Sequence, residues 1–294
     1  MGVGTPESSD RKRCLNCDAP LAGVYCASCG QRDSRPNPTL REFADEWFTE
    51  MFHWDGKLPS TVKTLLLEPG RLTEDFLAGR RARWLSPLRL YIICSIAFFL
   101  SGPVIERVTG YSAKAVARLN VTGDSSELQK LTDSTTFVND PEIRDNRLIR
   151  AIGAERAWTL ITNQVLLKDL VAEAIPKAMF ALLPFFALIT WLVWRSKGIE
   201  YPAHLVFAFH VHASFFLALL AGNLIEPIGS LWLTLVAQLA MLVYSTWYVV
   251  AACKRALGGT SAEVFARTTV LGLVYAPAAL AVVLMATLIA INAL

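Results

Sequence analysis

The chain has 294 residues, of which 53 % are apolar and 18 % are charged, and its net charge is +3. This composition excludes an ordinary soluble domain, because soluble proteins carry about 25 % charged residues. The charges crowd into residues 1–87 and 105–177, whereas four later blocks contain almost none. Residues 1–10 are polar and no apolar signal-peptide core follows them, so we expect a cytoplasmic N-terminus.

Two cysteine pairs open the chain in the segment CLNCDAPLAGVYCASCG. Each pair sits on a tight turn, and two such turns can direct four thiolates at one ion, which is typical of a closed structural zinc site. A redox pair expects a single CxxC in a βαβ context, and iron–sulfur clusters use other spacings. We therefore expect residues 11–35 to form a zinc ribbon that binds a structural Zn²⁺ through Cys14, Cys17, Cys26 and Cys29.

The residue after each pair fits the predicted turns. Gly30 follows the second pair and suits a turn with positive φ. Asp18 takes the same place after the first pair, and aspartate tolerates the left-handed region better than most residues. A ribbon of this kind serves either as a folding staple or as a docking site for a cytoplasmic protein partner, and the sequence leaves both open.

Residues 39–87 are predicted to form cytoplasmic amphipathic helices at the membrane interface. Thr39 and Glu42 make a capping box, and aromatic residues follow at helical spacing. Further on, short helices alternate with turn signals, and Thr73 is expected to cap one of them. Packing on the membrane helices, or in a soluble core, is the alternative.

An arginine cluster precedes the first apolar run. It consists of Arg80, Arg81, Arg83 and Arg89, with Trp84 among them. Cationic groups and an indole at this place predict contact with membrane lipid headgroups. A nucleic-acid patch is the alternative, but the apolar run follows at once. The basic residues near the cysteines also lack interleaved aromatic side chains, so we do not expect nucleic acid as a partner.

Five apolar runs approach or exceed the length that crosses the hydrocarbon core. They cover residues 88–105, 177–194, 201–225, 229–253 and 268–291. The sequence thus predicts a mainly α, polytopic α-helical membrane protein with about five transmembrane helices. The first helix is 88–105, an extracytoplasmic loop or small helical domain occupies 106–176, and helices 2–5 lie within 177–294. Cys94 and Cys253 are expected to be apolar fillers.

Basic residues predict the orientation of these helices. The arginine cluster, Arg195 with Lys197, and the basic residues between the fourth and fifth runs fall on one side if every run crosses. The opposite loop, 223–229, has no basic residue. The positive-inside rule then places the zinc ribbon in the cytoplasm and the C-terminus outside the inner (plasma) membrane. A thiolate site suits that reducing compartment.

The third run contains an unusual set of ionisable residues. Glu200 and His204 lie one helical turn apart and can pair, whereas His210 and His212 point in different directions and cannot share an ion. A further metal or acid–base site would have to recruit ligands from elsewhere on the cytoplasmic side. The candidate catalytic residues are His53, Asp55, Glu200 and His204. Hydrogen bonding between helices or to headgroups is the alternative for the histidines.

Several sequence blocks resemble one family. They are the cysteine pairs ending in CGQ, then HWDGK, LLLEPG, FLAGRRARWLSPLRLY and AHLVFAFHVH. Over residues 14–100 and 200–215 the chain is similar to a family of bacterial integral membrane proteins catalogued only as a domain of unknown function. The resemblance implies the ribbon and the membrane architecture, and it implies no activity or catalytic residue.

Three functions follow from these observations. The first is a non-enzymatic multi-pass membrane protein whose ribbon recruits or senses a partner, because the metal site is closed and no catalytic motif is present. The second is a membrane-embedded enzyme that acts on a lipid-linked or headgroup substrate through the candidate residues above. The third is a small-solute or ion transporter with a polar path past His210 or His212 to Asn223. The sequence leaves the oligomeric state open.

Overall fold

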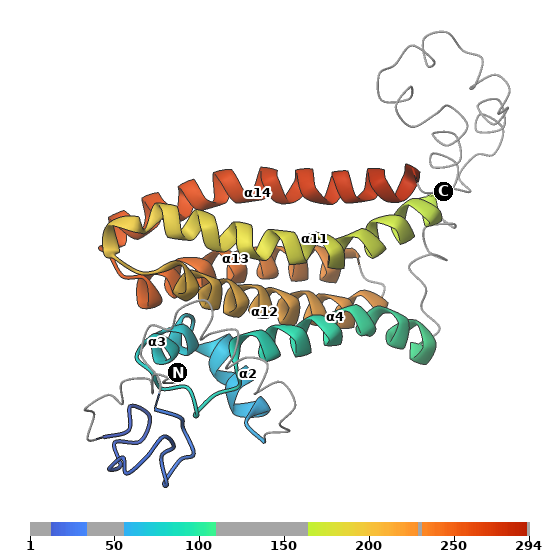
Figure 1. The fold of residues 1–294 in the computed structure, drawn as a ribbon. Coiled ribbons are helices and arrows are strands. Elements are labelled where there is room, and N and C mark those ends of the chain that lie inside the picture. The colour runs from blue at the N-terminus through green and yellow to red at the C-terminus, as the bar shows by residue number, and fades with distance from the viewer. Residues whose placement is uncertain (1–12, 34–55, 110–163, 229–230, 293–294) are drawn as a thin grey trace, which may run out of the picture. The chain divides into compact units, whose positions relative to one another are not determined.

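The computed structural model describes residues 13–33, 56–109, 164–228 and 231–292 (Figure 1). These residues form helices joined by turns, except for the segment 13–33, which contains the four predicted cysteine ligands. Within this segment the backbone forms two isolated antiparallel β-bridges, between Arg13 and Pro20 and between Tyr25 and Arg32. The predicted mainly α architecture is therefore confirmed.

The helices keep the labels of Figure 1. They are α2 (Leu58–Leu67), α3 (Arg71–Leu77), α4 (Pro87–Thr109), α11 (Gln164–Val193), α12 (Tyr201–Ile225), α13 (Leu231–Ala256) and α14 (Ser261–Asn292), with 3₁₀ turns at Arg195–Lys197 and Glu226–Ile228. The chain divides into two compact units. The first comprises residues 1–102 and 183–272, and the second comprises residues 103–182 and 273–294. The second unit contains the ends of α4 and α14 and the beginning of α11.

Among the described residues, four helices are long and apolar enough to cross a membrane. They are Pro87–Thr109, Tyr201–Ile225, Trp232–Ala256 and Ser261–Ile289. The predicted run 177–194 corresponds to a shorter apolar helix, Ala178–Val193, at the end of α11. The chain is thus a polytopic α-helical membrane protein.

The start of α14 differs from the prediction. The helix begins at Ser261 rather than at residue 268. The backbone N–H of Glu263 donates to the hydroxyl of Thr260 over 3.3 Å, and the N–H of Thr260 donates to the Glu263 carboxylate over 3.1 Å. This reciprocal pair is a capping box, which extends the helix beyond its apolar run.

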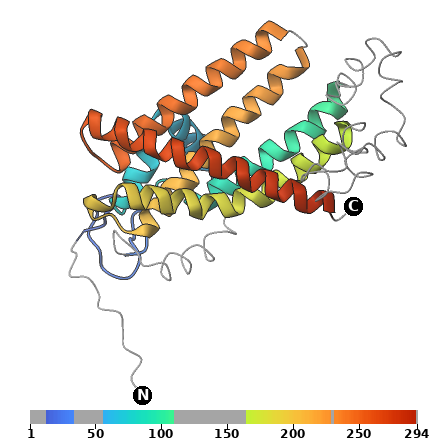
Figure 2. The same cartoon turned by 90° about the horizontal axis from the view of Figure 1, so that it is seen from above.

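Helix α12 is the buried centre of the first unit. It packs beside α13, as both views show (Figures 1 and 2), and it also contacts α2 and α3. Of its apolar window 56 % is buried, against 11 % for α13. A helix that is apolar on all sides belongs in such a position. By contrast, α13 exposes a stripe at helical spacing that suits contact with lipid, formed by Trp232, Leu235, Leu239 and Leu242.

The short helix α3 is tied to both α12 and α13. The N-cap residue that precedes it, Gly70, has φ of 79°, and a Cβ there would lie 2.8 Å from the carbonyl oxygen of Ala252 in α13. Thr73 was predicted to cap the helix, but it lies inside the helix, and its buried hydroxyl makes a 2.8 Å hydrogen bond with Nδ1 of His210. The helix begins at Arg71, so Thr73 cannot be its cap and the prediction is wrong. Its hydroxyl instead joins α3 to α12.

Asp75, also in α3, organises the arginine cluster. Its carboxylate is fully buried and accepts hydrogen bonds from Arg80 Nε (2.9 Å), Arg80 Nη2 (2.6 Å) and Trp84 Nε1 (2.8 Å). Arg71 Nε donates to the same group over 3.3 Å. The guanidinium of Arg81 lies 4.4 Å from the ring centroid of Phe76. Part of the cluster that suggested headgroup contacts therefore shapes the turn after α3.

The environment of Asp75 shifts its pKa. Burial alone would raise the pKa, but the hydrogen bonds from Arg80 and Trp84 and the charges of Arg80 and Arg71 outweigh burial and lower it. Because the folded pKa lies below the unfolded value of about 3.9, the resulting stabilisation is fully present above that value. It is lost as the pH falls through the folded pKa.

Replacing the charge of Asp75 should destabilise the protein strongly. In Asp75→Asn, two arginines whose side chains are each 33 % exposed lose the buried carboxylate that they share, and we expect the free energy of unfolding to fall by about 2 kcal/mol. Glu68→Gln is the matched control, because Glu68 is exposed and lies 3.7 Å from Arg255, a pair worth less than about 1 kcal/mol. Denaturant titration in detergent micelles measures both, and equal losses would contradict the structural role of Asp75.

Candidate metal centre

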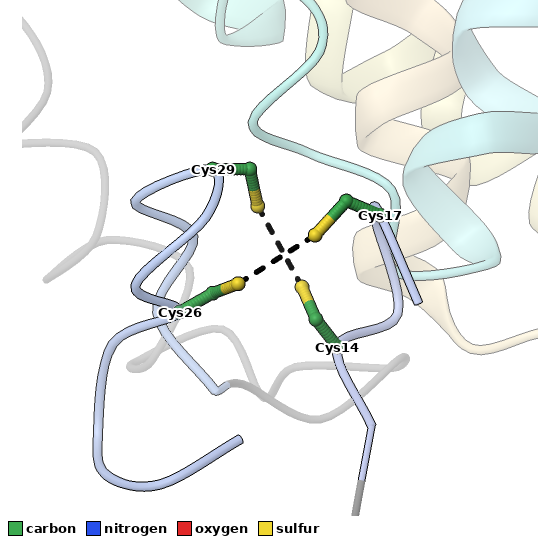
Figure 3. Close-up of side chains that lie close together, drawn as sticks. All are labelled: Cys14, Cys17, Cys26 and Cys29. Atoms are coloured by element: carbon green, nitrogen blue, oxygen red, sulfur yellow. Dashed lines mark hydrogen bonds between the residues drawn. The ribbon is translucent and has the colours of Figure 1, made fainter. Parts of the chain in front are cut away.

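The four predicted cysteine ligands converge on one point. Their sulfur atoms all lie within 4.8 Å of one another. Figure 3 shows the side chains pointing inward from two turns, with Cys14 Sγ 3.7 Å from Cys29 Sγ and Cys17 Sγ 3.5 Å from Cys26 Sγ. This is an arrangement that could hold a metal ion.

The two turns that carry the cysteines repeat the same backbone pattern. In the first turn, the N–H of Asp18 donates to the carbonyl of Cys14 over 2.9 Å, and in the second the N–H of Gly30 donates to the carbonyl of Cys26 over 2.9 Å. Asp18 has φ of 61° and Gly30 has φ of 74°. The positive φ predicted at both positions is confirmed. Each turn thereby presents its two thiols on one side.

The backbone also favours the thiolate form that a metal requires. The N–H groups of Cys29 and Ser28 point at the sulfur of Cys26 and lower its pKa to about 7. Cys17 receives a similar hydrogen bond from Ala19, but burial and the three neighbouring cysteines outweigh it and raise the pKa to about 11. Four sulfurs this close cannot all ionise without a cation between them, so the chemistry of the donor set fits a divalent metal ion.

Gln31 fastens the four-cysteine segment to the turn after α3. Its Nε2 donates to the carbonyl of Gly79 over 2.7 Å, and its Oε1 accepts from the N–H groups of Arg81 and Ala82, each over 3.0 Å. One buried side chain therefore satisfies three backbone groups of residues 79–82, which we call the docking turn. Its own backbone carbonyl accepts from the N–H of Cys26 over 2.8 Å. The position of Gln31 is thus set by the second cysteine turn.

A close apolar contact accompanies these hydrogen bonds. Gly79 has φ of 80°, and a Cβ at this position would lie 2.5 Å from Cδ1 of Leu15. Leu15 stands between the first two cysteines in the sequence. The docking turn is therefore in contact with both cysteine turns, through Leu15 at the first and Gln31 at the second.

The structure does not bring together the other predicted site residues that it describes. Glu200 is exposed, whereas the His204 side chain is fully buried, and neither of its ring nitrogens has a hydrogen-bond partner among the described residues. The predicted pairing of Glu200 with His204 is therefore wrong. The remaining two candidates, His53 and Asp55, lie outside the described residues.

Three other polar residues of α12 make hydrogen bonds, two of them to other helices and one within α12. His210 bonds Thr73, and Nδ1 of His212 lies 2.8 Å from the carbonyl oxygen of Ala208. Asn223 Nδ2 donates to Ser101 Oγ in α4 over 2.8 Å. The contacts of His210 and Asn223 match the structural alternative, in which polar residues of α12 hold helices together, whereas that of His212 lies within α12.

Sequence reasoning missed two residues that position the metal centre. Gln31 contributed to the predictions only as the end of the CGQ string. A glutamine in the sequence does not indicate which backbone groups its side chain will bind. Asp75 lies four residues after Arg71 and five before Arg80. Two adjacent acidic residues, Glu74 and Asp75, between arginines could have suggested an internal ion pair, but not which of the two is buried.

Comparison with known proteins identifies one part of the chain. Residues 55–99 match the model of a family described as "Protein of unknown function (DUF3667)". The matched segment includes α2, α3, the docking turn and the first part of α4. No curated protein and no solved structure matches the chain. The resemblance seen in the sequence is confirmed over this segment, because residues 55–99 match the model of a family of unknown function.

Proposed function

We propose that the protein is a non-enzymatic multi-pass membrane protein whose four-cysteine segment is a cytoplasmic zinc ribbon that recruits or senses a protein partner. The observation that carries this proposal is the convergence of four cysteine sulfurs in a segment held on the docking turn by Gln31. A closed site on a membrane-proximal platform suits recognition, because it leaves no open coordination position for chemistry.

The sulfur geometry supports zinc as the metal. Zinc binds thiolates at about 2.3 Å with tetrahedral geometry, which places the sulfurs about 3.8 Å apart. Two sulfur pairs in the site, at 3.5 and 3.7 Å, lie close to that spacing. When bound, zinc supplies a structural cross-link, and the four cysteines hold it while the surrounding N–H groups stabilise their charge.

The distribution of basic residues supports a cytoplasmic ribbon. Arg255 Nε donates to Glu74 in α3 over 3.0 Å. Arg267 donates to Ser196 over 3.1 Å, and Lys197 lies 3.6 Å from Glu263. The loop after α11 therefore meets the first turns of α14 at one end of the first unit, and the end of α13 lies against α3. Their basic residues satisfy the positive-inside rule at the cytoplasmic face of the inner membrane, and we infer that the membrane lipid there is a partner.

The outer surface of the ribbon supports binding of a cytoplasmic protein. Val24 and Tyr25 are 61 % and 64 % exposed in the loop before the second cysteine turn. Val24 and Tyr25 are distinct from Leu15 and Gln31, the residues that contact the docking turn. Adjacent exposed apolar and aromatic side chains on so small a module are typical of a recognition surface.

Elemental analysis of the purified full chain tests the metal assignment. We expect one zinc per chain in the wild type and none in the Cys14→Ser, Cys26→Ser double variant, because two of four ligands are lost. Cys253→Ala is the matched control, since Cys253 is buried in α13 and should leave the zinc content unchanged. Zinc retained by the double variant would contradict the site.

Reporter fusions test the orientation. Alkaline phosphatase, which is active only outside the cytoplasm, should be active when fused after Leu294 and inactive when fused after Gly258, in the loop that joins α13 and α14. An active Gly258 fusion would contradict the cytoplasmic placement of that loop. With the N-terminus in the cytoplasm, the C-terminus lies outside only if the number of crossings is odd. An inactive Leu294 fusion would therefore contradict the crossing of the membrane by the short helix Ala178–Val193 in addition to the four longer helices.

A further inference from the structure

The docking turn is held from two sides by different parts of the protein. Gln31, in the four-cysteine segment, binds the backbone of Gly79, Arg81 and Ala82. The side chain of Arg80, between them, binds Asp75 in α3 at 2.6 and 2.9 Å. The turn is therefore shared by the cysteine segment and by α3, so that a shift of one requires adjustment of the other.

Helix α3 extends the link to the membrane helices. Thr73 bonds His210 near the middle of α12, and Glu74 accepts a hydrogen bond from Arg255 at the end of α13. The backbone of α3 also lies against Ala252, where Gly70 leaves room for no side chain. Because α3 has only seven residues, these contacts act on one rigid element.

The opposite end of the link depends on the cysteine turn. The N–H of Cys26 donates to the carbonyl of Gln31, and the N–H of Gly30 donates to the carbonyl of Cys26. A metal that fixes Cys26 and Cys29 therefore fixes the backbone from which the Gln31 side chain projects. Without the metal, fewer than 25 residues with no apolar core of their own would have to hold that geometry.

We propose that metal occupancy of the ribbon is coupled through Gln31 and the docking turn to the seating of α3 on α12 and α13. In this proposal, metal binding to the ribbon stabilises the packing of α3 on α12 and α13, and Gln31 is the positioning residue that transmits the effect. This inference rests on the proposed zinc site. Coupling of this kind is reciprocal, so a loosened α3 must weaken metal binding as much as metal loss loosens α3.

The rate of zinc release to a chromogenic chelator tests the coupling in the full chain in detergent. We expect release from Gln31→Ala to be about tenfold faster than from the wild type, a size typical of lost outer-shell contacts. The control is Arg13→Ala, which removes an exposed pair with Asp18 inside the same segment but does not touch the docking turn.

A second variant tests whether the coupling reaches α12. Thr73→Val removes the hydrogen bond to His210 and leaves the ribbon untouched, and we expect it to speed zinc release severalfold. Thr246→Val is its control, because Thr246 bonds only within α13, to the carbonyl of Leu242. A purely local role for Gln31 would leave Thr73→Val at the wild-type rate.

The outcomes separate this inference from the proposed function. A wild-type protein that purifies without zinc overturns the proposed metal site. A zinc-loaded wild type whose release rate is unchanged in both Gln31→Ala and Thr73→Val overturns the coupling alone. Acceleration in Gln31→Ala but not in Thr73→Val also overturns the stated coupling, because α12 would then be outside it. Acceleration in both variants, with both controls at the wild-type rate, supports it.

Discussion

A buried carboxylate must be surrounded by donors, and the way Asp75 meets this requirement shapes the part of the protein next to the membrane. Two arginines and the indole of Trp84 close around it, which bends the chain directly after α3. The bend leaves a carbonyl and two N–H groups of the docking turn without partners in a helix. Gln31 satisfies all three. The charge network inside the platform thus creates the hydrogen-bonding edge that receives the four-cysteine segment.

Each part of this arrangement compensates for something that another part lacks. The cysteine segment is too small to bury a core, so in the proposed function a bound metal stabilises it together with the docking turn. Helix α3 is too short to be stable alone, and its contacts to α12 and α13 come from Gly70, Thr73 and Glu74. The membrane helices supply the rigid support, with α12 buried at their centre.

The sequence predicted what depends on local patterns and missed what depends on tertiary contacts. Ligand spacing and positive-φ positions identified the cysteine turns, and α12 was predicted with the bounds Tyr201–Ile225 that the structure has. The capping box at Thr260 was overlooked because apolar runs alone defined the helix ends. Threonine is a common helix cap, but the Thr73 hydroxyl hydrogen-bonds His210, 137 residues further along the chain. Helical spacing allowed Glu200 and His204 to pair, but α12 begins only at Tyr201, and the ring of His204 is buried while Glu200 is exposed.

In the proposed function, the segment matched to the family of unknown function is a platform, because the side chains of Asp75 and Arg80 build the docking turn. This proposal requires that Gln31 holds the four-cysteine segment on that turn. Hydrogen exchange at the amides of Arg81 and Ala82 tests it most directly, in the zinc-loaded full chain. The account predicts protected amides in the wild type and exchange at least about tenfold faster in Gln31→Ala. Equal exchange rates in the two proteins would contradict it.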